Sequence, residues 1–134
     1  MTTTHNTSGK AKTIGYWIST GLLVVCMLSG SIAQLLRAKA NVDGFHHLGY
    51  PVYMMTIIGT WKMLGVITLL LPGFRLLKEW AYAGFFFLMT GAVISHLVSG
   101  DGISGVIAQA TLVLLIVLSW ALRPASRKIA AAQI

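Results

Sequence analysis

The sequence predicts an all-α integral membrane protein that folds as an up-and-down bundle of four transmembrane helices. Of its 134 residues, 56% are hydrophobic and only 10% are charged, and the mean hydropathy of +0.78 is far above the value for soluble domains. Four apolar runs each approach the roughly 20 residues needed to cross a bilayer. No alternation of polar and apolar residues at strand period competes with this prediction.

The chain divides into one membrane domain and two short tails. The predicted spans cover residues 14–36, 52–72, 80–98 and 103–122. We expect the first span to be retained, because its apolar stretch exceeds the roughly 7 to 15 residues of a signal peptide. The membrane domain therefore extends over residues 14–124. A tail at 1–13, which we expect to be flexible, precedes it, and a second tail at 125–134 follows it.

The links between the later spans are short and contain turn residues. The Leu-Pro-Gly sequence at residues 71–73 ends the second span, because proline cannot continue a helix. The Gly-Asp-Gly sequence at residues 100–102 predicts a tight hairpin between the third and fourth spans. Short links place consecutive helices side by side and antiparallel, which is the up-and-down arrangement.

The distribution of Lys and Arg predicts a cell-membrane protein with both termini in the cytoplasm. Basic residues beside transmembrane spans are retained on the cytoplasmic side. Seven lie on the side of the two termini: Lys10, Lys12, Arg75, Lys78, Arg123, Arg127 and Lys128. Only Arg37 and Lys39 lie on the other side. Because the basic residues cluster at span ends, the net charge of +7 indicates membrane anchoring and no nucleic-acid partner.

Lys62 is the first candidate for a functional residue, because it lies in the middle of the second span. An ammonium near the bilayer midplane costs about 2.5 to 3.5 kcal/mol, so such residues usually face the bundle interior and have a partner or a use. We expect that partner to be Asp101 or Asp43, in contact directly or through a water molecule. In the predicted orientation the amine points outward and lies about 10 Å below the outer surface.

Other polar residues of the spans also fall in the outer half of the bundle, which predicts a polar pocket that opens outward. His96 lies about 5 Å and Gln109 about 9 Å from the outer ends of their helices. The predicted ligand-binding residues are Lys62, His96, Gln109, Asp101, Tyr53, His46 and His47. For most of them a purely structural role remains an alternative: His96 as an interfacial histidine, and Gln109 as a hydrogen-bonding residue between helices.

The sequence assigns no catalytic residue and no metal site. His46 and His47 are adjacent and so point apart on a helix, and no Cys, Glu or further His follows at the spacing of one helical turn. Cys26 is the only cysteine, so no disulfide can form within the chain. No nucleophile-base pair, phosphate-binding glycine loop or pair of carboxylates is present. Whether the protein is an enzyme is left open.

Small residues repeat on two of the spans. Gly84, Gly91 and Ser95 fall near one face of the third span, and Gly59 and Gly65 flank Lys62 on the second. Small residues allow helices to approach closely in lipid. We expect most of them to pack inside the bundle, with a homodimer face as the alternative.

Several segments together resemble the DoxX-like family of small membrane proteins. They are FHHLGYP (residues 45–51), GTWKMLG (59–65), LKEWAYAG (77–84), GAVISH (91–96), GD (100–101) and SWALRP (119–124). The resemblance extends from about residue 14 to 124 and implies a four-helix membrane bundle. It also implies a link to redox chemistry, since the founding members look like subunits of quinone-linked oxidoreductases. Lys62, Glu79, His96 and Asp101 match recurring positions of the family pattern.

Three functions follow as hypotheses. The first is an accessory or quinone-interacting subunit of a membrane redox system, in which Lys62 and His96 bind a quinone carbonyl and a redox protein is the partner. The second is a protein that binds or transports a small apolar molecule or lipid without catalysis. The third is a membrane isomerase, by analogy of helical architecture alone.

Overall fold

The computed structural model describes residues 3–129 and consists of helices joined by short turns, with no strand in that range. The helices are α1 (Thr3–Leu35), α2 (Lys39–His47), α3 (Tyr53–Leu70), α4 (Arg75–Val98) and α5 (Gly102–Leu122), followed by the short turn η1 (Ala125–Arg127). Four segments are long and apolar enough to cross a membrane: Ser8–Leu35, Tyr53–Leu70, Arg75–Val98 and Gly102–Leu122. The predicted all-helical membrane fold is confirmed.

Two boundaries differ from the sequence prediction. Helix α1 begins at Thr3, so residues 3–13 are helical and continuous with the first span, and the expected flexibility of this tail stays a prediction. The first connection contains α2, a nine-residue helix with no buried side chain. An ion pair one turn apart, from Lys39 Nζ to Asp43 Oδ2 at 3.3 Å, supports α2 locally. The end of the second tail, residues 130–134, lies outside the described residues.

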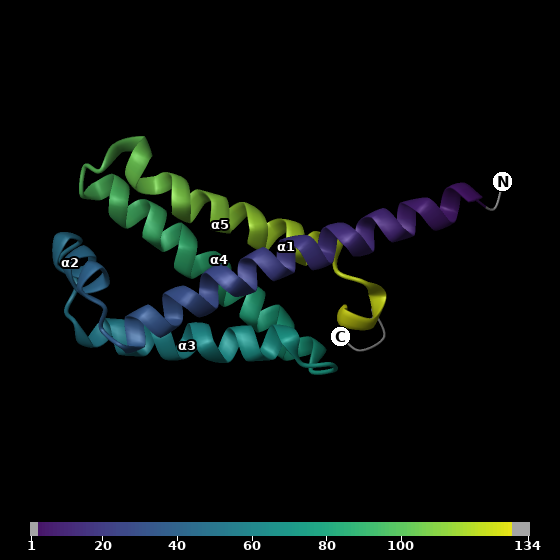
Figure 1. The fold of residues 1–134 in the computed structure, drawn as a ribbon, viewed down its shortest axis with the longest axis horizontal. Helices are drawn as coiled ribbons and strands as arrows, with labels where there is room; N and C mark the ends of the chain where they lie inside the picture. The colour runs from purple at the N-terminus through teal and green to yellow at the C-terminus, as the bar shows by residue number, and fades with distance from the viewer. Residues whose placement is uncertain (1–2, 130–134) are drawn as a thin grey trace.

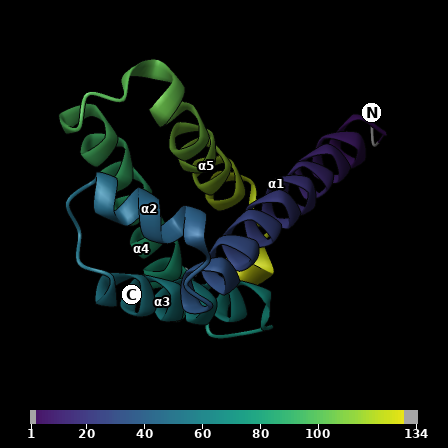
Figure 2. The same cartoon turned by 60° about the vertical axis from the view of Figure 1, so that its left-hand side comes forward.

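The four long helices form two antiparallel hairpins that pack on each other. Helix α1 packs beside α3 and α5, and α4 packs beside the same two helices, as the up-and-down arrangement requires. Figure 1 shows the α4–α5 hairpin diverging from α1 and α3 toward the end that carries α2. In Figure 2, α2 lies between the two diverging parts. We call this end the loop end, and the opposite end, with η1 and the α3–α4 turn, the terminal end.

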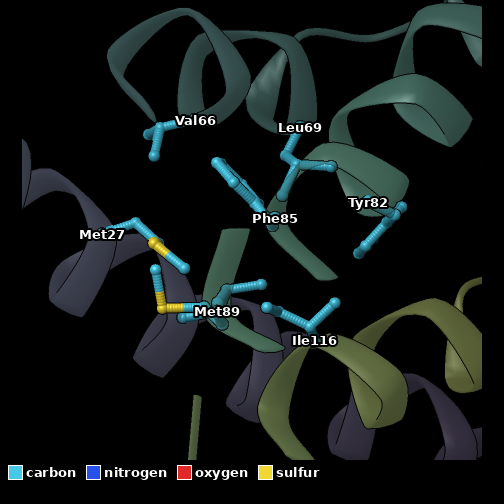
Figure 3. Packing of buried hydrophobic residues seen from close by; sticks show 8 residues of the cluster. Met27, Val66, Leu69, Tyr82, Phe85, Met89 and Ile116 are labelled. Atoms are coloured by element: carbon cyan, nitrogen blue, oxygen red, sulfur yellow. The ribbon is translucent and has the colours of Figure 1, made fainter. Parts of the chain in front are cut away.

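The apolar core lies where the two hairpins cross. Side chains from all four long helices meet there, as Figure 3 shows. Helices α1, α3 and α4 contribute residues spaced three or four apart, because that spacing brings side chains to one face, and α5 contributes one residue. The cluster comprises Leu23, Met27, Val66, Leu69, Tyr82, Phe85, Met89 and Ile116. Many large apolar side chains on the opposite faces are exposed, which suits a surface that contacts lipid.

Buried hydroxyl groups connect three of the helices within this core. Ser119 Oγ of α5 lies 2.6 Å from Thr20 Oγ1 of α1 and 2.7 Å from Tyr82 Oη of α4. Near the loop end, Ser31 of α1 donates a hydrogen bond to the carbonyl of Gly59 at 2.6 Å. In lipid, where no hydrophobic effect drives helices together, such bonds stabilise helix association.

The glycines of α3 and α4 differ in how closely a neighbouring helix packs against them. A Cβ added at Gly65 would lie 2.6 Å from the Phe85 ring, so this glycine permits close packing of α3 on α4. A Cβ added at Gly84 or Gly91 would meet nothing within 4 Å. The expectation that these two glycines pack inside the bundle was therefore wrong. The alternative, a homodimer face on α4, stays a prediction.

Candidate functional site

Lys62 belongs to the inward face of α3. The buried residues of this helix are Met55, Gly59, Lys62, Val66 and Leu69, a spacing of four and three residues that marks one helix face. Lys62 therefore takes a position at which its neighbours along the helix are small or apolar. Its side chain is only 7% exposed. The prediction that Lys62 faces the bundle interior agrees with this placement.

The Lys62 amine reaches across to α1. Nζ donates a hydrogen bond to Gln34 Oε1 at 3.3 Å, and Gln34 is itself buried. One turn earlier on α1, Gly30 makes room for the amine, because a Cβ added there would lie 2.9 Å from Nζ. The amine thus lies close to the backbone of α1 with one neutral partner.

Neither of the two expected carboxylates forms a direct ion pair with Lys62. Asp43 pairs with Lys39 on the exposed side of α2, and Asp101 bonds to two histidines. Among residues 3–129, no carboxylate lies within ion-pair distance of Lys62. The sequence did not reveal this outcome, because span boundaries alone do not fix which way a residue in a link faces.

A cleft between α3 and α4 has Lys62 on its wall. Its volume is about 410 Å³, and its lining is mostly apolar and aromatic. The lining includes Trp61, Lys62, Gly65, Trp80, Gly84 and Phe85. The cleft opens on the outer surface of the bundle, where Trp61 and Trp80 are 68% and 64% exposed. None of the other predicted ligand-binding residues lines it.

A second polar group lies at the loop end, centred on Asp101. Its Oδ1 lies 2.5 Å from His47 Nε2 at the end of α2, and its Oδ2 lies 2.6 Å from His96 Nδ1 in the last turns of α4. Gln109 Nε2 of α5 lies 3.3 Å from His96 Nε2. We call Asp101, His47, His96 and Gln109 the Asp101 cluster.

The hydrogen bonds of the Asp101 cluster assign the proton positions on His96. The carboxylate accepts, so His96 donates from Nδ1, and its Nε2 accepts from the Gln109 amide. Hydrogen bonds from His96 and then His47 hold the pKa of Asp101 below its ordinary value. Asp101 therefore connects α2 to the α4–α5 turn as a charged acceptor.

Two predicted site residues belong neither to the α3–α4 cleft nor to the Asp101 cluster. Tyr53 is 61% exposed at the start of α3, and His46 is exposed on α2. The seven predicted residues thus separate into Lys62 at the cleft, the four residues of the Asp101 cluster, and these two surface residues. Within residues 3–129, no group of three or more His, Cys, Asp or Glu side chains is arranged to hold a metal ion.

The sequence reasoning missed the structural role of Lys78. This side chain is only 1% exposed at the terminal end. Its Nζ donates to the carbonyls of Thr68 at 3.1 Å, of Gly73 at 2.7 Å, and of Leu71. Lys78 thereby satisfies carbonyls at the end of α3 that lack partners within the helix. The signal was present, because Lys78 lies one turn before Tyr82 on the buried face of α4.

The four apolar helices and their lipid-facing surface define an integral membrane protein of the helical-bundle class. The family comparison assigns it more narrowly. The sequence model of the DoxX-like family matches residues 18–121, and the chain belongs to that family. No curated protein and no solved structure matches the chain significantly.

Proposed function

We propose that this protein binds a small apolar molecule that carries a hydrogen-bond acceptor, and that the ligand enters the α3–α4 cleft from the bilayer. One observation carries the proposal: the buried Lys62 forms part of the wall of a cleft that opens on the outer surface of the bundle. This is the second of the three hypotheses, binding or transport without catalysis.

The cleft has the properties expected of a ligand site. Its volume of about 410 Å³ falls within the roughly 300 to 1,000 Å³ of small-molecule pockets, which are mostly apolar with a few convergent polar groups. Lys62 supplies the polar group. A charged amine has three donors, and Lys62 uses one of them on Gln34, so donors remain for a ligand.

A quinone is a narrower form of the same proposal. Quinones have an apolar ring and carbonyl acceptors, and the aromatic side chains of Trp61, Trp80 and Phe85 offer surfaces for ring packing. In this form the protein serves as an accessory subunit, and a partner protein carries out the redox reaction. The version in which Lys62 and His96 bind one carbonyl has less support, because His96 belongs to the Asp101 cluster. No particular contact favours the isomerase hypothesis.

We also propose that the terminal end faces the cytoplasm and that the bilayer is the cell membrane. The basic residues support this orientation, because seven of them flank the terminal end and two flank the loop end. The loop end, with α2 and the Asp101 cluster, then faces outward.

The test of ligand binding is mass spectrometry of small molecules extracted from protein purified in mild detergent. Gly84→Leu adds bulk to the wall of the cleft at a position where an added Cβ meets nothing within 4 Å. Gly91→Leu is the matched control, since Gly91 is equally open on the same helix but outside the cleft. We expect wild type and Gly91→Leu to retain the same ligand and Gly84→Leu to lose it.

The Lys62→Met variant tests the role of the amine in the same experiment. Methionine keeps the length of the side chain but removes the charge, and Lys39→Met is the surface control. A ligand retained by wild type and Lys39→Met but lost from Lys62→Met supports the proposal. Equal ligand content in wild type and Gly84→Leu rules out the cleft as the binding site.

A further inference from the structure

Within residues 3–129, no acidic side chain supplies a counter-charge for Lys62. The sequence contains three acidic residues in all. Asp43 pairs with Lys39, Glu79 pairs with Arg123, and Asp101 bonds to His47 and His96. No acidic side chain is left for Lys62, whose one hydrogen-bond partner is the neutral amide of Gln34.

An uncompensated ammonium inside a membrane is costly. Buried charges are paired in nearly all proteins, because the low-dielectric interior does not solvate them as water does. A ligand that brings a negative charge removes this cost, and a neutral ligand does not. The site therefore favours an anionic ligand over a neutral one of the same shape.

The surroundings of Lys62 allow such a pairing. The bond from Nζ to Gln34 is long at 3.3 Å, so a carboxylate competes for the amine with a single neutral acceptor. Lys62 is one of the residues that line the cleft, and its four-carbon chain is flexible, so the amine can turn from α1 toward a ligand. The ligand's apolar part then packs against Trp61 and Phe85.

Resting on the proposed function, we infer that the ligand is a single-chain amphiphile with a carboxylate head, of the long-chain fatty acid class. The carboxylate pairs with Lys62 and the chain lies in the apolar cleft between α3 and α4. A volume of about 410 Å³ accommodates one chain better than the two chains and bulky head group of a phospholipid.

The experiment compares a long-chain fatty acid that carries a photoreactive diazirine with the alcohol of the same chain. The full-length protein is reconstituted in bilayers of neutral phosphatidylcholine, irradiated with each probe, and digested to map the labelled peptides. We expect the acid to label peptides of α3 and α4 at least about tenfold more than the alcohol, as charge-assisted hydrogen bonds are worth that much or more.

Three variants test the role of charge. Lys62→Met should lower labelling by the acid to the level of the alcohol, while Lys62→Arg should keep the preference. Gln34→Glu gives Lys62 a carboxylate partner of nearly unchanged shape, so it should also abolish the preference for the acid. This last variant keeps the test valid if Lys62→Met does not fold, and thermal unfolding in detergent checks each protein.

Each outcome has a distinct meaning. Equal labelling of the cleft by acid and alcohol overturns the inference of a carboxylate but leaves the proposed function in place. Absence of cleft labelling by both probes, or labelling unaffected by Gly84→Leu, overturns both. Acid labelling that survives in both Lys62→Met and Gln34→Glu overturns the pairing with Lys62. Displacement by phosphatidylserine but not by unlabelled fatty acid assigns the carboxylate to a lipid head group and overturns the single-chain ligand.

Discussion

The amine of Lys62 on α3 lies so close to Gly30 on α1 that a single added carbon at Gly30 would be 2.9 Å from Nζ. Any side chain at this position would compete with the amine for space. The pair links the position of the intramembrane charge to the packing of two helices. A substitution at Gly30 therefore moves the amine without removing it, whereas a substitution of Lys62 removes the amine altogether.

Gly30→Ala should move the Lys62 amine away from Gln34 while leaving the fold intact. The amine is the far end of a flexible side chain, so the expected change in the free energy of unfolding is less than about 1 kcal/mol, and the higher helix propensity of alanine offsets part of it. The amount of ligand retained through detergent purification should change several-fold. Thermal unfolding and mass spectrometry of extracted ligand measure the two effects.

The matched control for this prediction is Gly21→Ala on the same helix, where an added Cβ meets nothing within 4 Å. It should leave ligand content unchanged. If Gly30→Ala and Gly21→Ala retain the same amount of ligand, the position of the amine does not matter for binding.

The sequence was sufficient to predict the spans but not the pairings between their side chains. Hydropathy identifies the four long helices because the bilayer requires about 20 apolar residues in each. Helix α2 was missed because it is short and polar and buries no side chain. Its position nevertheless decides the partner of Asp101, since His47 at its end reaches the carboxylate that was expected to pair with Lys62.

The inward direction of Lys62 was predictable, and its partner was not. Its spacing from Gly59 and Val66 places it on one face of α3. The neighbouring helix, by contrast, depends on how α1 is rotated and shifted along α3, which periodicity within one helix does not fix. The same limit explains why Lys62 and His96, both polar and both toward the loop end, were expected to share one pocket.

Asp101 should make the protein less stable in acid. Its pKa is lowered in the folded state by the hydrogen bonds from His96 and His47, so the carboxylate stabilises the fold above its unfolded pKa. This stabilisation is lost as the pH falls below about 4, through the folded pKa. We expect the thermal midpoint of wild type to decrease across this range, and that of Asp101→Asn to be lower at pH 6 and to change less.

Asp43→Asn is the control for the acid effect, because Asp43 pairs with Lys39 on an exposed surface of α2. Its thermal midpoint should follow that of wild type at every pH. A pH profile of Asp101→Asn that is parallel to wild type between pH 6 and 3 contradicts the assignment.

Lys78→Met should destabilise the terminal end by about 2 to 4 kcal/mol. The substitution removes the donor that bonds the carbonyls of Thr68, Leu71 and Gly73, in the last turn of α3 and the link that follows it. We expect a net loss equal to one or two hydrogen bonds to a charged group, each worth about 1.5 to 3 kcal/mol, because carbonyls freed at a helix end can bond to water instead. Lys12→Met is the surface control, since Lys12 is exposed on α1. Chemical unfolding in detergent measures both, and equal stability of the two variants refutes the capping role.

The proposed orientation predicts which residues a membrane-impermeant thiol reagent can reach in intact cells. Cys26 is the only cysteine, so Cys26→Ser provides a background free of thiols. In that background, Ala40→Cys on α2 should react in intact cells, because the loop end faces outward. Ser126→Cys in η1 should react only after the cells are permeabilised. The opposite pattern assigns the loop end to the cytoplasm, and the Asp101 cluster would then be exposed to cytoplasmic pH.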